Sequence, residues 1–317
     1  MNKRSRVILL LSVSLLCLSV QVFALTENEK KTVELIEGSY KSGDPIWLIM
    51  ERGKQAYELG EFGLAARVFR EAIDRQSVNP DAHMWLGYIF EKEGEWTLAE
   101  KEYQQALKDK NQLYILEDRF TIMYRLADIY RRTDQWGRYE RILIEVLEDD
   151  GTYQQAFSTQ YAMVKVLKEK GLDKLFELYR WENNRHVRAR RELGVFYYRT
   201  GRYNEAENNL VLAVMSAVTV GFDYILEKTA DYDYTELAVH VENMCRYPEL
   251  VDYMRKNEFF QSLYYLGASL YADGFRSRAE ELWTLVAESA AGNSKWRARS
   301  LSQLREPFIE PVIVPRS

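Results

Sequence analysis

Three histidines are the first residues in this chain whose side chains could bind a metal ion or transfer a proton. They are His83, His186 and His240, and long stretches of sequence separate them. Metal sites built on one helix or loop need ligands a few residues apart, as in the H-E-x-x-H helix of zinc proteases. No such spacing is present, so we predict no metal site at these histidines.

The carboxylate and thiol side chains give no stronger indication of chemistry. Asp231 and Asp233 begin like a calcium loop, but Thr235 and Glu236 stand where an acid or amide and then a glycine are needed. Cys245 follows an apolar helical stretch, and we expect a buried small hydrophobe rather than a nucleophile. The sequence has no phosphate-binding loop, G-x-S-x-G elbow or C-x-x-C pair. We therefore predict a protein that is not an enzyme, with no catalytic residue and no cofactor.

A period of 34 residues indicates which elements position the side chains. Small and large residue types return in the same order, which is typical of stacked helical repeats. We expect the small residues to let the two helices of a unit approach closely, and Tyr103 and Trp96 to fill the space toward the neighbouring unit. The first set, Gly53, Gly60, Phe62, Ala65, Phe69 and Ala72, returns as Gly87, Gly94, Trp96, Ala99, Tyr103 and Ala106.

This pattern resembles the tetratricopeptide repeat, in which helix A carries Leu-Gly, a glycine makes the turn, and an aromatic residue and alanines follow in helix B. The resemblance implies an all-α fold, a right-handed α-solenoid of about five to seven helix pairs. A looser third copy has Leu126-Ala127, with Tyr139 where alanine is expected. The closest later copies carry Leu193-Gly194, Gly201, Tyr203 and Ala206, then Leu266-Gly267, Gly274, Ala279 and Trp283.

The spacing of the copies predicts how the chain is divided. We expect Thr26 with Glu29 to cap a leading helix, and Asp44-Pro45 and Asn79-Pro80 to begin repeat helices. The predicted parts are a leading helix and linker at 25–44, a solenoid at 45–304, divergent helix pairs within it at about 153–186 and 221–258, and an extended tail at 305–317.

The tail is predicted to be extended because Pro307, Pro311 and Pro315 exclude a helix. Two interpretations remain open. The tail is a mobile end or lies along its own last helices, or it is a linear segment that docks on a partner.

Residues 1–24 have the features of a secretory signal. Lys3, Arg4 and Arg6 precede an apolar run, and cleavage is expected after Ala24. A retained membrane anchor is the alternative, although the run is shorter than the roughly 20 residues that a spanning helix needs. Lipid anchoring at Cys17 is a third and less favoured interpretation, because the residue before it is not small.

Composition restricts the partners of the exported chain. The formal net charge is −5, and removal of a basic signal makes it more acidic, so nucleic-acid binding is not expected. Cys245 would be the only cysteine left, which excludes an intramolecular disulfide. We noted no further apolar run of about 18 residues and expect no membrane span after the signal.

The resemblance implies that helix A of each unit lines a concave groove. That groove would be aromatic at both ends and arginine-rich in the middle, and tyrosine and arginine are enriched at binding hot spots. An acidic peptide, a carboxyl terminus or an anionic envelope polymer would pair with its arginines. The predicted groove residues are Trp47, Tyr57, Tyr88, Tyr124, Arg131, Arg132, Arg188, Arg191, Tyr198, Arg199, Tyr264 and Tyr271.

Three classes of function remain open at this point. The leading hypothesis is an exported scaffold or adaptor of the bacterial envelope that holds a protein or peptide partner in this groove. The second is an accessory or carrier subunit of a transport system that binds a small anionic solute. The third is an enzyme whose site has no local motif, for which 221–258 is the first place to look.

Overall fold

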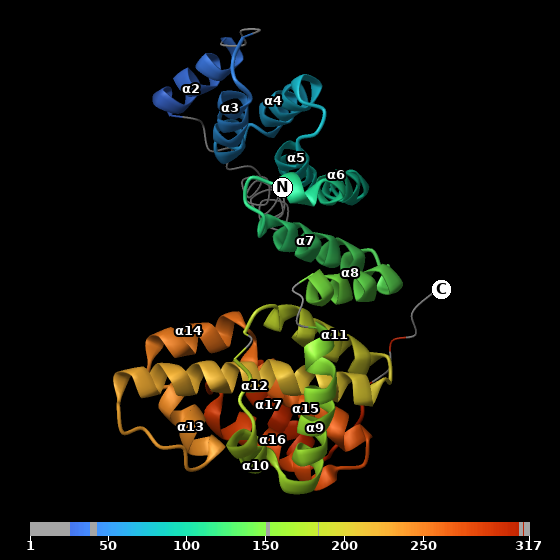
Figure 1. The fold of residues 1–317 in the computed structure, drawn as a ribbon, viewed down its shortest axis with the longest axis vertical. Helices are drawn as coiled ribbons and strands as arrows, with labels where there is room; N and C mark the ends of the chain where they lie inside the picture. Colours follow the sequence, from blue (N-terminus) through green and yellow to red (C-terminus); the bar gives the residue numbers. More distant parts are fainter. Residues whose placement is uncertain (1–25, 39–42, 150–152, 183, 311–312, 314–317) are drawn as a thin grey trace, which may run out of the picture. The chain divides into compact units, whose positions relative to one another are not determined.

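The computed structural model describes residues 26–38, 43–149, 153–182, 184–310 and 313, and every regular element in these ranges is a helix (Figure 1). The all-α prediction is confirmed. Two compact units divide the chain, unit 1 at Met1–Leu116 and unit 2 at Glu117–Ser317. The predicted signal at 1–24, and Cys17 within it, lie outside the described residues.

Unit 1 consists of a leading helix and two antiparallel helix pairs. The second helix of the first pair packs on the first helix of the next, as stacked repeats require. Its elements are α2 (Glu27–Gly38), the pair α3 (Ile46–Glu58) and α4 (Phe62–Arg75), the pair α5 (Pro80–Glu93) and α6 (Trp96–Lys108), and the short 3-10 helix η1 (Lys110–Gln112).

The helix starts follow the predicted capping chemistry in two of three cases. Thr26 and Glu29 form a reciprocal capping box, and the Asn79 side chain accepts the Ala82 amide at 3.0 Å. The prediction for Asp44 is wrong. α3 begins after Pro45 without a side-chain cap, because the Asp44 carboxylate instead pairs with Arg52 at 2.5 Å.

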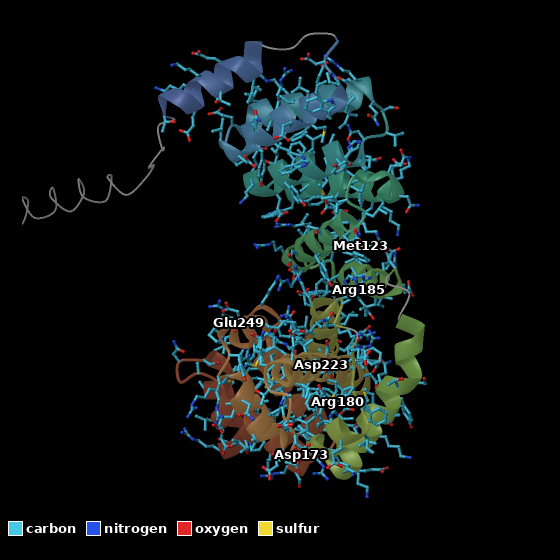
Figure 2. All side chains as sticks on the ribbon, turned by 60° about the vertical axis from the view of Figure 1, so that its left-hand side comes forward. Met123, Asp173, Arg180, Arg185, Asp223 and Glu249 are labelled. Carbon is cyan, nitrogen blue, oxygen red and sulfur yellow. The ribbon has the colours of Figure 1, made fainter. Side chains whose placement is uncertain are left out.

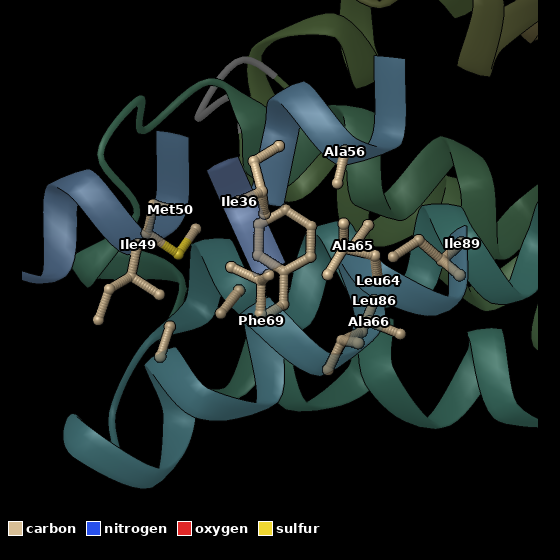
Figure 3. Packing of buried hydrophobic residues seen from close by; sticks show 13 residues of the cluster. Ile36, Ile49, Met50, Ala56, Leu64, Ala65, Ala66, Phe69, Leu86 and Ile89 are labelled. Carbon is tan, nitrogen blue, oxygen red and sulfur yellow. The ribbon is translucent and has the colours of Figure 1, made fainter. Parts of the chain in front are cut away.

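The core of unit 1 lies between these helix pairs (Figure 3). Phe69 of α4 is fully buried there, and Leu86 and Ile89 of α5 join the same cluster. Ile36 of α2 is also buried in it. The leading helix is therefore packed on the first repeat.

Four of the helix pairs are closed by a bulky side chain that lies over a glycine, while the α7–α8 pair carries Ala127 in place of the glycine. An added Cβ on Gly87 would lie 2.4 Å from the Tyr103 ring, and Gly53 and Phe69 stand in the same relation at 2.6 Å. In unit 2 the corresponding pairs are Gly194 with Leu210 and Gly267 with Trp283. The Tyr103 ring thus covers the glycine of its own pair, and its packing toward the neighbouring unit stays a prediction.

Unit 2 contains three further pairs that stack in order. α7 packs on α8, α8 on α11, α11 on α12, and α15 on both α11 and α12. Its helices are α7 (Asp118–Arg132), α8 (Trp136–Asp149), α9 (Tyr153–Lys170), α10 (Leu172–Leu178), α11 (Val187–Arg199), α12 (Tyr203–Lys228), α13 (Leu237–Met244), α14 (Pro248–Lys256), α15 (Phe259–Ala272), α16 (Arg276–Ser289) and α17 (Lys295–Arg305).

The two divergent segments differ from ordinary repeats in where they pack. α9 and α10 turn at Gly171, as expected, but α11 stacks directly on α8 while α9 packs on α12. The segment 221–258 is not one helix pair. Its first turns continue α12 to Lys228, and the short helices α13 and α14 follow, with Pro248 opening α14.

Asp173 of α10 connects the two divergent segments. Its Oδ1 accepts the Leu237 amide at 2.6 Å, at the start of α13, and the Tyr234 hydroxyl at 2.8 Å. Figure 2 labels Asp173 together with Arg180, whose guanidinium lies over the Phe176 ring at 3.6 Å. The Asp173 contacts attach the two segments to each other.

α12 is the one helix in the described part of the chain that is long and apolar enough to cross a membrane. Our reading of the sequence missed this stretch. Within the structure, 72% of its apolar window is buried by other helices. Gly221 lies inside this helix rather than at a turn, and the Met244 side chain of α13 fills the space beside it.

Candidate functional site

The predicted groove residues fall into two groups, one in each unit. In unit 1, Tyr57 and Tyr88 both contact the Trp85 ring, with centroids 5.3 and 5.4 Å away. Both rings are therefore part of an aromatic cluster. Trp47 is 69% exposed and lines a cavity of about 450 Å³, which Tyr114 also lines. Tyr114 was not among the predicted residues.

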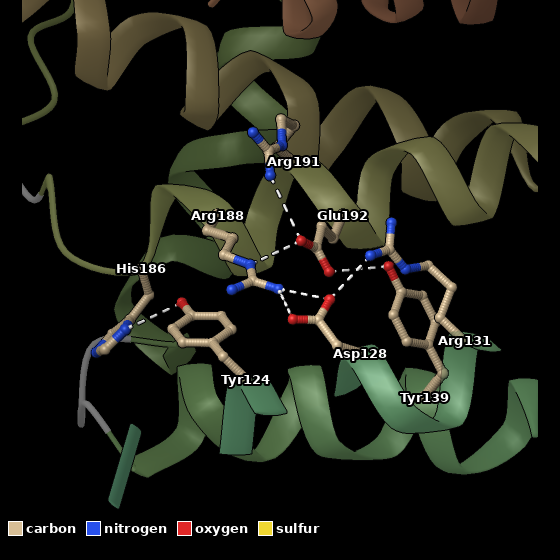
Figure 4. A network of polar contacts seen from close by, with 8 residues as sticks. All are labelled: Tyr124, Asp128, Arg131, Tyr139, His186, Arg188, Arg191 and Glu192. Atoms are coloured by element: carbon tan, nitrogen blue, oxygen red, sulfur yellow. Dashed lines mark hydrogen bonds and ion pairs between the residues drawn. The ribbon is translucent and has the colours of Figure 1, made fainter. Parts of the chain in front are cut away.

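In unit 2, three of the predicted arginines form a network with acidic residues of α7 and α11 (Figure 4). Arg188 Nη2 donates to both oxygens of Asp128 at 2.9 Å, and its Nε donates to Glu192 at 2.7 Å. Arg131 donates to Asp128 at 2.8 Å, and Arg191 lies 3.4 Å from Glu192. The arginine-rich middle of the groove is thus largely balanced by two carboxylates that the prediction left out.

Burial and pairing act in opposite directions on these arginines. Burial alone would lower the pKa of Arg188, but Glu192 and Asp128 outweigh it and raise the pKa. For Arg191 burial dominates and lowers the pKa. Arg188 is therefore held by strong, charge-assisted hydrogen bonds, which makes it a structural link between α7 and α11.

The predicted tyrosine of α7 packs against this network. The Arg188 guanidinium lies 4.6 Å from the centre of the Tyr124 ring, and the Tyr124 hydroxyl is 3.3 Å from Nδ1 of His186. Burial raises the pKa of Tyr124. Tyr139 of α8, which was not predicted as a site residue, donates to Glu192 at 3.0 Å.

A cavity of about 260 Å³ lies beside the network. Arg131 stands at its rim with half of its side chain exposed. The adjoining Arg132, also predicted, is exposed on α7 but does not line the cavity. The lining residues are Arg131, Trp136, Tyr139, Arg191, Glu192, Val195, Phe196, Arg199, Gln261 and Ile313.

The remaining four predicted residues contact the chain's own tail. Tyr198 and Tyr264 are buried, and their hydroxyl groups bond to the Glu310 amide and carboxylate, both at 3.0 Å. Arg199 pairs with the same carboxylate at 3.3 Å, and the Tyr271 hydroxyl donates to the Pro307 carbonyl at 3.3 Å. The described part of the tail thus lies along its own last helices, one of the two interpretations left open.

The residues first considered for chemistry are not brought together. His83 lies 2.7 Å from Glu102, while His240 is buried between the Tyr232 hydroxyl and the Val218 carbonyl. No three His, Cys, Asp or Glu residues among those described are arranged to hold a metal ion. The prediction for Cys245 is wrong, since its side chain is exposed at the end of α13.

A family model described as tetratricopeptide repeat matches residues 50–115. The chain contains tetratricopeptide repeats. A protein of Treponema pallidum (strain Nichols) is 29% identical over 235 residues, which cover 71% of this chain and 63% of that protein, so the chain spans less than two thirds of its length. A protein of Borreliella burgdorferi is 22% identical over 293 residues, covering 82% and 90% of the two chains. Both relatives are described as uncharacterized.

Two solved structures are similar to the tetratricopeptide chain at low identity. YrrB, described as a TPR protein with an unusual peptide-binding site, is 10% identical with a TM-score of 0.42, covering 86% of this chain and 97% of its own. BtubC (BKLC) from P. vanneervenii is 17% identical with a TM-score of 0.45, covering 92% and 96%. The fold assignment here rests on this chain's own helix pairs and on the family match.

Within unit 2, the stacked helix pairs bring eight of the predicted residues together at two adjoining places on α11. Its first half carries the arginine–carboxylate network, and its second half carries the contacts to the tail. Arg299 and Gln303 of α17 belong to the second place and were missed, because nothing in a repeat pattern marks a helix outside the repeats as part of a groove.

Proposed function

We propose that this tetratricopeptide protein is an exported scaffold of the bacterial envelope that holds a peptide or protein partner on the α7–α8–α11 face of unit 2. Tetratricopeptide repeats form a protein-interaction fold, and repeat proteins of this kind are generally non-catalytic. The observation that carries the proposal is the cavity that Arg131, Arg191 and Arg199 line together with aromatic rings. Arginine and aromatic side chains provide directional polar groups on a large contact area.

Arg131 is the residue best suited to test the groove. Half of its side chain is exposed although it pairs with Asp128, so a partner can reach it. Arg188 is a poor choice, because its substitution would leave Asp128 and Glu192 without their main partner and destabilise the unit. Arg255 of α14 is a matched control, since it is exposed, pairs with Asp252 on its own helix and does not line the cavity.

The test is recovery of partners from native envelope extract with the purified chain, its Arg131→Glu variant and its Arg255→Glu variant. Circular dichroism first establishes that both variants keep their helices. We expect at least one partner that is recovered by the unmodified chain and by Arg255→Glu, but lost with Arg131→Glu. Equal recovery by all three proteins excludes the cavity from partner binding.

Export is tested separately, by the amino-terminal mass of the protein isolated from its native cells. Cleavage after Ala24 predicts a chain that begins at Leu25. A chain that begins at Cys17 with added lipid mass, or one that retains Met1, contradicts this part of the proposal.

The size of the cavity favours a peptide side chain over a free solute. Small-molecule sites usually measure about 300–1,000 Å³. The cavity of about 260 Å³ is smaller and Glu192 also lines it, so a free anion would meet a carboxylate. A carrier function therefore has less support than a scaffold.

A further inference from the structure

The segment from Pro307 to Glu310, with Ile313, is bound by groups that recognise an extended backbone. The Phe308 amide donates to Gln303 Oε1 at 2.9 Å, and Gln303 Nε2 donates back to the Phe308 carbonyl at 3.1 Å. The Ile313 amide donates to the Arg199 carbonyl at 2.6 Å. The Glu310 amide also donates to the Tyr198 hydroxyl. All of these bonds are made by the backbone of the segment, so they do not depend on its side chains.

Only one side chain of this segment is bound deeply. The Glu310 carboxylate is paired with Arg199 and Arg299 and accepts the Tyr264 hydroxyl, and Glu310 is 6% exposed. Among the groups that contact the segment, Tyr198, Tyr264 and Gln303 are at most 1% exposed, whereas the side chains of Arg199 and Arg299 are 33% and 36% exposed. Two guanidinium groups and a phenol donate to one carboxylate and so form a binding site for an acidic side chain.

The apolar side chains of the segment contribute much less. Phe308 and Ile309 remain 46% exposed, so nearly half of their surface stays in water. Ile313 lines the same cavity as Arg131. The segment is therefore held by its backbone and one carboxylate, and any extended chain with a glutamate at that position offers the same contacts.

We propose that α11, α15 and α17 form a receptor for an extended acidic segment of a partner protein, and that Pro307 to Glu310, with Ile313, occupy it as an internal competitor. The proposal rests on the scaffold function above and names the chemistry of its partner, a glutamate between apolar residues on a backbone pre-extended by proline. A tethered segment competes at a high effective concentration, so a partner must bind several contacts at once to replace it.

The test uses the full chain and a fluorescein-labelled peptide with the sequence of residues 306–315, followed by fluorescence anisotropy. Glu310→Gln in the chain weakens the internal segment, and the added peptide then binds at least about tenfold more tightly than to the unmodified chain. Glu306→Gln is the matched control, because Glu306 is exposed and close in sequence, and it leaves the affinity unchanged. A peptide with glutamine in place of Glu310 loses most of its binding.

A second measurement covers the case in which Glu310→Gln fails to fold. In the unmodified chain, the Phe308 and Glu310 amides exchange slowly with deuterium because Gln303 and Tyr198 accept them. Excess heavy-isotope peptide of the same sequence accelerates exchange at both amides. Equal affinities for the unmodified and Glu310→Gln chains, or unprotected amides at these two positions, overturn the proposal.

Two further outcomes separate this inference from the scaffold proposal. Peptide binding that persists when Arg299→Met is added to Glu310→Gln overturns the receptor, even if Arg131→Glu still abolishes partner recovery. The unmodified chain could instead form concentration-dependent dimers that the peptide dissociates. That result would assign the segment to a second copy of the chain and overturn the partner proposal. If partner recovery is unchanged with Arg131→Glu while Glu310→Gln still raises peptide affinity about tenfold, the cavity is excluded as a partner site and the receptor proposal stands.

Discussion

Substitution of Gly87 by alanine tests the close packing of a glycine under a bulky side chain, which four of the helix pairs share. The new Cβ would lie 2.4 Å from the Tyr103 ring, closer than real Cβ atoms approach such a neighbour. The ring has little freedom to move, because Tyr103 is fully buried and its hydroxyl donates to Glu91 at 2.8 Å. The substitution therefore has to shift α5 away from α6.

Two opposing effects set the size of the change. Alanine in place of glycine inside a helix is favourable by about 0.5–1 kcal/mol, because glycine loses more conformational freedom on folding. Overpacking of a filled core costs about 1–3 kcal/mol. The second effect is larger, so we expect Gly87→Ala to lower the free energy of unfolding by about 1–2 kcal/mol. Gly63→Ala in α4 is the control, since no atom lies within 4 Å of the added Cβ.

The assay is urea unfolding followed by circular dichroism, with hydrogen exchange at α5 and α6 amides to assign the change to unit 1. Gly63→Ala should leave stability unchanged or raise it slightly. A Gly87→Ala protein that is as stable as Gly63→Ala would refute the reasoning. Tyr103→Leu should relieve the clash, because α7 and α8 carry Ala127 and Leu143, both buried, at the same spacing. The double variant should then lose less than the sum of the single changes.

Two further predictions concern the same core and the pH dependence of stability. Tyr103→Ala leaves a void against Gly87 and should lower the free energy of unfolding by about 3–5 kcal/mol in the same assay; a loss below about 1 kcal/mol would show that the ring is not in the core. Burial raises the pKa of Glu207 to about 7, with Lys168 opposing it. When folding raises the pKa of a carboxyl group, its contribution to the free energy of unfolding is fully present below its unfolded pKa. This contribution is lost as the pH rises through the folded pKa of about 7. Between about pH 5 and pH 8, Glu207→Gln should gain on the order of 2 kcal/mol relative to the unmodified chain, measured as the difference in unfolding free energy. A difference that is the same at both pH values contradicts this assignment.

The repeat architecture could be predicted because its determinants are close in sequence. Gly60 and Gly94 make their turns with φ of 80° and 79°, a conformation that side chains with a Cβ rarely adopt. Gly87 and Tyr103 belong to one pair, so their contact follows from the copy itself. Such contacts recur at fixed spacing, which is what makes them visible in a single sequence.

Gly221 shows where the same argument fails. We expected a divergent helix pair in residues 221–258, but α12 continues through Gly221 to Lys228. The glycine accommodates the Met244 side chain instead of making a turn. A glycine predicts either a turn or a close approach between helices, and only the partner residue distinguishes the two.

The candidate site could be predicted in composition but not in pairing. The resemblance to tetratricopeptide repeats predicts that Arg188 and Tyr198 face a groove, but it says nothing about what covers them. Asp128 reaches Arg188 from the preceding repeat, and Glu310 reaches Tyr198 from beyond the last helix. Both contacts join positions far apart in sequence, so no local pattern reveals them.

The two halves of α11 suggest how a partner longer than the tail would bind. Arg199 is shared, because it pairs with Glu310 and also lines the cavity beside Arg131. Ile313 lies between the tail contacts and the cavity, because its amide donates to the Arg199 carbonyl and the residue also lines the cavity. An extended chain that placed a carboxylate at the Glu310 position would therefore continue toward Arg131. Since Asp128 and Glu192 already balance the inner arginines, the rim residue Arg131 is where a second acidic side chain of the partner would add affinity.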